Sequence, residues 1–273
     1  MTEMDGREIA GTSGRLFVRR WDKPESRYIA LLAHGYGEHV GRYEYVAERL
    51  VAHGAVVYGP DHAGHGRSEG EHALVPPGEV LTADLHLVCG LAREEHPDLP
   101  VVLIGHSMGG LVATRFTQKH GAELIALVLS GPVVGGSPDL EALLTMDPIP
   151  DVPIDPAVLS RDPAVGAAYA ADPLVWHGPF KRGTLEQLFA GMDAAAQGPD
   201  FGMLPTLWIH GEEDALVPLG PAREAMEHLR GPATEQKTYP GARHEIFNET
   251  NRDEVIADVL AFLDRVLPPR EPG

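Results

Sequence analysis

Ser107 stands at the centre of a pentapeptide whose residue types suit nucleophilic catalysis. Residues 105–109 read Gly-His-Ser-Met-Gly, directly after an apolar run and before a helix-like pattern at residues 111–119. A serine on a sharp turn between a strand and a helix is held in a strained backbone conformation that exposes its hydroxyl. The flanking glycines are required because such a turn leaves no room for side chains. The pattern therefore predicts that Ser107 attacks a carbonyl carbon.

The oxyanion formed in such an attack needs hydrogen-bond donors that converge on it. The backbone amide of Met108 begins the expected helix, where unpaired amides and the helix dipole favour negative charge. A second donor must come from another loop, and residues 34–37, His-Gly-Tyr-Gly, directly follow an apolar run. We expect the amides of Tyr36 and Met108 to form this oxyanion hole.

A serine nucleophile also needs a histidine to accept its proton and a carboxylate to orient that histidine. In α/β hydrolases the acid follows the serine along the chain and lies in the loop after a later strand. The loop after residues 206–210 holds Glu212, Glu213 and Asp214. We predict Asp214 as the acid, because it precedes an apolar segment that allows burial, whereas the two glutamates are expected to be solvated.

The general base must follow the acid, and two histidines do so. His244 comes after the strand-like residues 235–239 and a turn, while His228 belongs to a helical pattern and is expected to face solvent. We therefore predict His244 as the base, completing a catalytic triad with Ser107 and Asp214.

Residues 61–68, Asp-His-Ala-Gly-His-Gly-Arg-Ser, contain the residue types of a metal site. No third histidine or cysteine lies at ligand spacing, so a tight glycine-rich loop pinned by hydrogen bonds of Asp61 and Ser68 is the better interpretation. The proposed chemistry requires no metal and no organic cofactor.

Short apolar runs alternate with amphipathic stretches along most of the chain, as in a parallel sheet covered by helices. The expected inner strands are residues 28–33, 55–59, 101–105, 125–130 and 206–210, with residues 235–239 as the last strand and residues 16–20 as an edge strand. Helices are expected at residues 43–53, 81–92, 111–119, 222–229 and 255–266. We predict an α/β-hydrolase fold, with a mostly parallel central sheet flanked by helices.

The stretch at residues 131–200 interrupts this alternation. It holds 10 of the 24 prolines and lacks a strand–helix pattern, yet it keeps apolar residues. Long structureless loops are uncommon in compact domains, so we predict an inserted cap, or lid, subdomain at 131–200. Residues 1–130 and 201–273 would then form the α/β-hydrolase core.

Composition excludes several classes of function. A formal charge of −18, from 40 acidic and 22 basic residues, disfavours binding to nucleic acid. No apolar run is long enough to span a membrane, and Cys89, the only cysteine, shares an apolar helical face and is expected to be an inert buried thiol. We expect a cytoplasmic protein without a transmembrane segment.

Several segments resemble the monoacylglycerol lipase family of serine hydrolases. They include His-Gly-Tyr-Gly-Glu-His at residues 34–39, Gly-Arg-Tyr at 41–43, the loop 61–68, Gly-His-Ser-Met-Gly-Gly at 105–110, Ala-Tyr-Ala-Ala-Asp-Pro-Leu at 168–174 and Tyr-Pro-Gly-Ala-Arg-His-Glu at 239–245. The resemblance implies hydrolysis of monoacylglycerol to glycerol and fatty acid, under a mobile cap with an apolar tunnel for the acyl chain. It also implies that Arg42, His106 and Tyr169 lie near the glycerol end of the substrate.

The expected cap departs from the family in its charge. It carries ten acidic and three basic residues, which disfavours binding to anionic bilayers. Its apolar residues leave open a transient contact with lipid aggregates and a peripheral association with membranes.

Other functions share parts of this pattern. A carboxylesterase of broader specificity or a lysophospholipase would have the same triad and differ in the cap. A dehalogenase would have aspartate in place of Ser107, and a non-catalytic ligand-binding relative would normally lack one of the three triad residues, all of which this chain contains.

Overall fold

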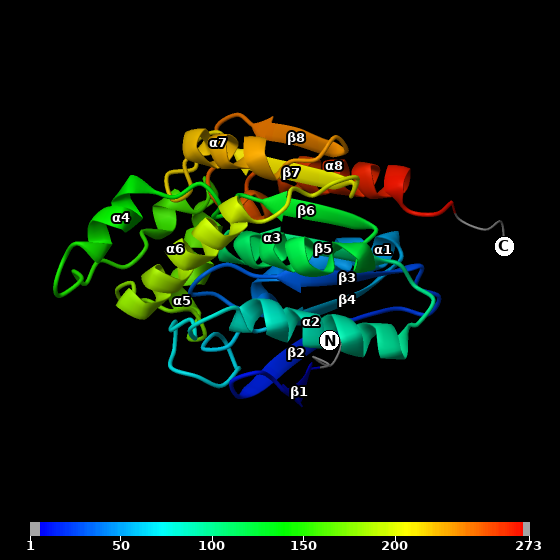
Figure 1. Ribbon diagram of the computed structural model, residues 1–273, viewed down its shortest axis with the longest axis horizontal. Helices are drawn as coiled ribbons and strands as arrows, with labels where there is room; N and C mark the ends of the chain where they lie inside the picture. Colours follow the sequence, from blue (N-terminus) through cyan, green and yellow to red (C-terminus); the bar gives the residue numbers. More distant parts are fainter. Residues whose placement is uncertain (1–5, 270–273) are drawn as a thin grey trace.

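The computed structural model describes residues 6–269, which form one eight-stranded sheet with helices on both faces (Figure 1). The strand order is β1-β2-β4-β3-β5-β6-β7-β8. The β1–β2 and β2–β4 pairs are antiparallel, and the other five pairs are parallel. The chain therefore has the predicted α/β architecture with a mostly parallel sheet.

The strands are β1 (Gly6–Ala10), β2 (Arg15–Trp21), β3 (Tyr28–Ala33), β4 (Ala55–Pro60), β5 (Val101–His106), β6 (Ala126–Ser130), β7 (Thr206–Gly211) and β8 (Thr234–Tyr239). The α-helices are α1 (Glu44–His53), α2 (Val80–Glu95), α3 (Met108–His120), α4 (Pro138–Leu144), α5 (Pro163–Ala171), α6 (Arg182–Gln197), α7 (Leu219–Leu229) and α8 (Arg252–Val266). Short 3-10 helices are η1 (Val40–Tyr43), η2 (Gly121–Glu123), η3 (Pro156–Val158) and η4 (Ile246–Asn248).

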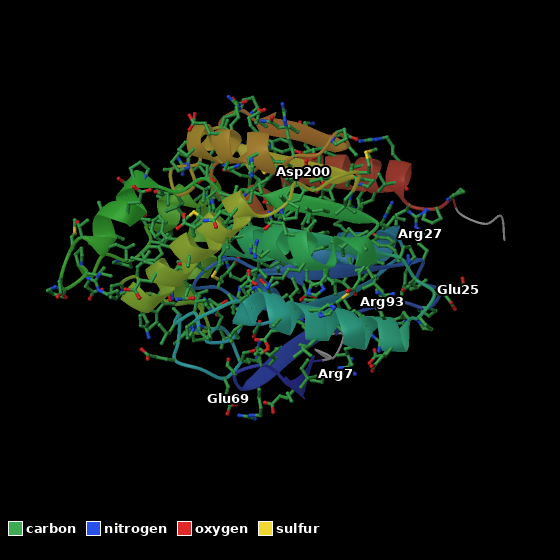
Figure 2. All side chains as sticks on the ribbon, in the orientation of Figure 1. Arg7, Glu25, Arg27, Glu69, Arg93 and Asp200 are labelled. Carbon is green, nitrogen blue, oxygen red and sulfur yellow. The ribbon has the colours of Figure 1, made fainter. Side chains whose placement is uncertain are left out.

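Two apolar layers hold the sheet between its helices. Alternate side chains of the inner strands point to opposite faces, so that Leu31 and Leu103 pack with α2, α3 and α7, whereas Leu32 and Ile104 pack with α1 and α8. Figure 2 shows side chains filling the space between the sheet and the helices. Cys89 lies in the first of these layers, and burial raises the pKa of its thiol to about 11, so it is the inert thiol predicted from the sequence.

One strand assignment was wrong. Residues 16–20 were expected at the edge of the sheet, but β2 pairs with β4 on one side and with β1 on the other. The edge strand is β1, which sequence inspection missed because most of its side chains are exposed and it contains no apolar run. The loop after β4 contacts the start of β2, where the backbone N–H of Glu69 donates to Arg15 O at 2.8 Å; Glu69 is labelled in Figure 2.

Residues 131–200, called here the helical segment, form the connection between β6 and β7. The segment contains α4, η3, α5 and α6, and in Figure 1 α4 and α5 lie beyond the left end of the sheet. Two Asp-Pro pairs begin its short helices: the carboxylates of Asp155 and Asp162 accept the amides of Ala157 and Ala164, at 2.9 Å in both cases. Proline follows each cap because its missing N–H costs nothing at a helix start.

The helical segment is tied to loops of the sheet by polar contacts. The Trp176 amide donates to Gly37 O at 2.7 Å, and His39 Nε2 lies 2.8 Å from Asp172 Oδ2. At the other side, Arg161 Nε donates to the buried Glu249 Oε2 at 2.9 Å. These contacts fix the segment over the carboxyl ends of the strands.

No helix among residues 6–269 combines the length and the apolar character needed to cross a lipid bilayer.

The glycine-rich loop after β4 has the hydrogen bonds expected from the sequence. Asp61 Oδ2 accepts the Arg67 amide at 2.9 Å, and Ser68 Oγ donates to Asp61 O. The loop also buries His62 and His65 against His34, whose ring centroid lies 4.3 Å from that of His62. Neither ring nitrogen of His62 has a hydrogen-bond partner within the described residues.

Burial of His62 predicts a loss of stability in mild acid. Burial lowers the pKa of His62 to about 3, whereas in an unfolded chain it is about 6.5. As the pH falls below 6.5 the unfolded chain therefore takes up a proton that the folded chain excludes, and stability decreases. Between pH 7 and pH 5 this single group should remove roughly 2 kcal/mol from the free energy of unfolding.

His62→Phe keeps an aromatic ring at this position but removes the group that titrates. The free energy of unfolding, measured with urea at pH 7 and pH 5, should therefore decrease by about 2 kcal/mol less in this variant than in the wild type. The control is His228→Gln, at an exposed histidine of α7. An equal decrease in the free energy of unfolding between pH 7 and pH 5 in the His62 variant and the wild type would contradict this account.

Candidate active site

Ser107 lies in the turn between β5 and α3, with φ of 54° and ψ of −119°. A non-glycine residue at positive φ is strained, and it persists only where its surroundings hold it. Its amide donates to Ser130 O at 2.9 Å, while its carbonyl accepts the Gly110 amide at 2.9 Å and the Val133 amide at 3.1 Å. These bonds hold the turn in the predicted strand–turn–helix context.

Gly105 and Gly109 permit this turn by their lack of side chains. A Cβ on Gly105 would collide with Gly109 O, and a Cβ on Gly109 would collide with Ala33 O at the end of β3. The start of α3 thus lies directly against the loop that carries Tyr36. Both positions therefore require glycine, as predicted for a turn that leaves no room for side chains.

The structure brings Ser107, His244 and Asp214 into one hydrogen-bonded chain. His244 Nε2 lies 2.8 Å from Ser107 Oγ, and His244 Nδ1 lies 2.7 Å from Asp214 Oδ2. The three residues come from the loops after β5, β7 and β8, and all are buried. Glu212 and Glu213 are exposed, as is His228, so the alternative acids and base stand away from this chain of contacts.

The loop after β7 fixes Asp214. Its Oδ1 accepts the amides of Leu216 and Val217, at 3.0 and 2.8 Å. Burial opposes ionisation of Asp214, but the positive charge of His244 and hydrogen bonds from the neighbouring histidines outweigh it and hold the pKa of the carboxyl well below its usual range.

The same charges act on His244. Burial disfavours its protonated form, yet the charge and hydrogen bond of Asp214, with further negative charge from Glu245 and Glu38, raise its pKa above the ordinary value. A raised pKa makes the imidazole a stronger proton acceptor, which is what a base facing a serine hydroxyl requires.

Sequence reasoning missed a residue that supports Asp214. His210, at the end of β7, accepts a hydrogen bond from Trp208 Nε1 on Nδ1 at 3.2 Å, and therefore carries its proton on Nε2. That N–H donates to Val217 O at 2.8 Å and lies 3.4 Å from Asp214 Oδ2. The sequence feature that could have indicated this role is the position of His210, four residues before Asp214.

The loop at residues 34–37 lies beside Ser107. A Cβ on Gly35 would stand 3.3 Å from the Cβ of Ser107, and the Gly35 amide donates to Glu38 Oε1 at 2.7 Å, which fixes the loop. The amides of Tyr36 and Met108 donate no hydrogen bond within residues 6–269. They are thus free to donate to a ligand next to Ser107.

Arg42 lies between two buried carboxylates at the wall of the pocket beside Ser107. Its Nη1 donates to Glu38 Oε2 and Glu245 Oε1, both at 2.6 Å, and its Nη2 donates to Glu245 Oε2 at 2.8 Å. Tyr169 covers the guanidinium, with its ring centre 5.0 Å from Cζ. Glu38 and Glu245 were not predicted from the sequence as site residues, although Glu38 lies four residues before Arg42 and Glu245 directly follows His244.

This Glu38–Arg42–Glu245 cluster connects two loops of the site. Glu38 holds the Gly35 amide, and Glu245 is adjacent to His244 and donates its own amide to Leu159 O at 2.8 Å. Burial opposes ionisation of Glu245, but the positive charge and hydrogen bonds of Arg42 keep its pKa below the ordinary value.

His106 also lies in the site, in contact with His244. Its Nδ1 is 3.0 Å from Ser130 Oγ, and its ring centroid is 4.7 Å from that of His244. Burial, reinforced by the charge of His244, lowers the pKa of His106 to about 3, so that it is neutral at physiological pH.

A pocket of about 580 Å³, part of it open to solvent, lies beside Ser107 and His244. One end is polar and contains the Glu38–Arg42–Glu245 cluster, His106 and Tyr169. The rest is apolar, and the helical segment contributes much of it, including Leu140, Leu159 and Leu188. A neutral molecule with one polar end and one apolar chain would fit this distribution.

Groups that could share a metal ion lie elsewhere. Within the described residues such a group consists of His86, His120 and Glu123. His120 ends α3 whereas Ser107 precedes it, a separation of roughly 18 Å along the helix. The residues around Ser107 therefore do not form a metal-binding group of this kind.

Comparisons with known proteins identify relatives that cover nearly the whole chain. The family described as "Serine aminopeptidase, S33" matches residues 24–251. A monoacylglycerol lipase of Mycolicibacterium smegmatis is 37% identical over 266 residues, covering 93% of this chain and 95% of its own.

Among solved structures, a monoacylglycerol lipase of Paleococcus ferrophilus has a TM-score of 0.75 at 28% identity, covering 91% of this chain and 98% of its own. A soluble variant of monoglyceride lipase from Saccharomyces cerevisiae has a TM-score of 0.86 and covers 99% of this chain and 97% of its own. At 21% identity that likeness concerns the fold alone.

Removal of Arg42 should destabilise the protein strongly. Arg42→Met leaves Glu38 and Glu245 buried without their cation, and breaking a buried ion pair in this way costs about 3–5 kcal/mol. Urea unfolding at pH 7 measures the loss. The control is Arg230→Met, whose partner Glu227 is about as exposed as Arg230 itself, so that its loss should stay below about 1 kcal/mol. Equal losses of unfolding free energy in Arg42→Met and Arg230→Met would show that the cluster does not carry buried charge.

Proposed function

Because this chain belongs to the monoacylglycerol lipase family of α/β hydrolases and is a serine ester hydrolase, we propose that it cleaves monoacylglycerols to glycerol and fatty acid, with Ser107 as the nucleophile. The observation that carries this proposal is the hydrogen-bonded chain from Ser107 through His244 to Asp214, at the wall of a pocket with one polar and one apolar end. An acyl ester of a polyol matches that pocket in both shape and polarity.

In the first half of the reaction His244 accepts the Ser107 proton as the oxygen attacks the ester carbonyl. The negative charge that develops on the carbonyl oxygen is stabilised by the Tyr36 and Met108 amides. Each such donor contributes on the order of 3–4 kcal/mol to transition-state stabilisation. Collapse of the tetrahedral intermediate breaks the ester bond, and protonated His244 gives its proton to the departing glycerol oxygen.

The second half repeats these steps with water. Water attacks the carbonyl carbon of the acyl-enzyme while His244 accepts a proton from it. His244 then gives this proton to Ser107 Oγ when the fatty acid leaves. Asp214 stays ionised throughout, because its low pKa and two backbone amides favour the carboxylate. No step requires a metal ion or an organic cofactor.

The polar end of the pocket would receive the glycerol moiety. Neutral His106 and the Tyr169 hydroxyl can exchange hydrogen bonds with its hydroxyl groups. Arg42 would act less as a substrate ligand than as the support of this end, since Glu38 and Glu245 occupy much of its donor capacity.

The helical segment would act as the cap over this pocket. Its chain between α4 and η3 exposes Met146 and Val152, which have 42% and 64% of their surface accessible. We propose that these side chains touch lipid aggregates transiently while substrate enters. The acidic character of the segment would direct such contact to neutral or zwitterionic surfaces rather than to anionic bilayers.

The nucleophile is tested by Ser107→Ala. Loss of the hydroxyl should lower turnover on 1-monoacylglycerol by roughly four to six orders of magnitude, while substrate binding persists. Turnover is measured by glycerol release, and folding is checked by thermal unfolding. Full activity in the variant would show that another residue is the nucleophile.

Substrate class is tested by comparing kcat/KM across 1-monoacylglycerols, short nitrophenyl esters and lysophospholipids. We expect monoacylglycerols to be the best substrates, because the polar end is lined by two carboxylates and one guanidinium and so disfavours a phosphate group. A preference for short nitrophenyl esters would indicate a carboxylesterase of broader specificity. A preference for lysophospholipids would indicate a lysophospholipase.

A further inference from the structure

A second pocket, of about 410 Å³ and partly open to solvent, lies between α2, α3 and α6. Its lining is mostly apolar and includes Leu81 of α2, Leu111 and Val112 of α3 and Gly191 of α6. Apolar surface of this kind favours contact with apolar ligands over contact with water. The second pocket thus suits an alkyl group.

The two pockets share part of their walls. Met108 and Leu188 line both. Met108 directly follows Ser107, and Leu188 belongs to α6 of the helical segment, so the shared wall lies close to the nucleophile. Methionine is unbranched and flexible, and it adapts its shape to neighbouring groups more readily than other apolar residues.

Polar contacts lie along part of the rim of the second pocket, which is partly open to solvent. Arg115 Nε lies 2.6 Å from Glu79 Oε1, and Gln187 Oε1 accepts the Gly78 amide at 2.8 Å. An alkyl group that lies in the first pocket would reach the second past Met108 and Leu188, which line both.

We propose that the second pocket receives the distal end of a long acyl chain, and that a movement of the Met108 side chain joins the two pockets. The inference rests on the proposed function, in which the ester carbonyl lies at Ser107 and the acyl chain lies in the apolar part of the first pocket. Short acyl chains end within the first pocket, and long chains extend into the second. The second pocket thus sets the preference for chain length.

Gly191→Leu tests the inference because Gly191 lines only the second pocket. A Cβ at this position would lie 3.0 Å from Leu111 Cδ2, the flexible end of a side chain, so the added leucine fills the cavity without meeting backbone. Leucine also favours a helix more than glycine does. The matched control, Ala196→Leu, adds bulk to the exposed face of the same helix.

The measurement compares 1-monoacylglycerols of eight and sixteen acyl carbons, dispersed at a fixed detergent ratio. Each methylene kept out of an apolar site costs about fourfold in kcat/KM. We expect Gly191→Leu to lower kcat/KM for the sixteen-carbon ester at least tenfold and to leave the eight-carbon ester within twofold of the wild type. The Ala196 variant should match the wild type on both.

Labelling of Ser107 by octyl and hexadecyl fluorophosphonates separates this inference from the proposed substrate. If the wild type cleaves no monoacylglycerol, the proposed substrate is wrong, and selective slowing of the hexadecyl reagent by Gly191→Leu still reports on the second pocket. Unchanged chain-length selectivity in Gly191→Leu, or an equal loss for long and short chains, would overturn the inference.

Discussion

The close approach of the start of α3 to the end of β3 is the constraint on which the site depends. Without side chains at positions 105 and 109, the helix begins so near Ala33 O that Ser107 and the loop at residues 34–37 become neighbours. Ser107, the proposed nucleophile, and the expected oxyanion donors thus follow two parallel strands that are adjacent in the sheet. The strain at Ser107 is held by hydrogen bonds to Ser130, Gly110 and Val133.

Buried charges connect this turn to the rest of the site. Asp214 orients His244, and the Glu38–Arg42–Glu245 cluster joins the loop after β3 to the loop after β8. A single guanidinium can do this because its planar donors bind several carboxylate oxygens in fixed directions. The helical segment then covers these groups, and its contacts with Gly37, His39 and Glu249 position the apolar wall of the pocket.

The sequence predicted the strands and helices of the core well, because buried parallel strands are continuously apolar and the helices between them carry regular apolar stripes. It missed β1, whose side chains are mostly exposed and leave no such trace. It also left the helices of residues 131–200 unresolved, since several are short and begin at Asp-Pro caps rather than showing an apolar period. Ser107, Asp214 and His244 were predicted as candidates from their order along the chain and their positions in loops that follow strands. The contacts of Glu38, Glu245 and His210 could not be predicted, because they depend on how separate loops meet in space.

The charge of the Glu38–Arg42–Glu245 cluster bears on the end of the reaction as well as its start. Under the proposed function, an uncharged monoacylglycerol enters the pocket and one product is a fatty acid, which is ionised at neutral pH. Two carboxylates and one guanidinium leave a local excess of one negative charge beside the position where that product forms. Electrostatic repulsion in this poorly solvated site therefore favours release of the fatty acid carboxylate, after which the site can bind the next ester.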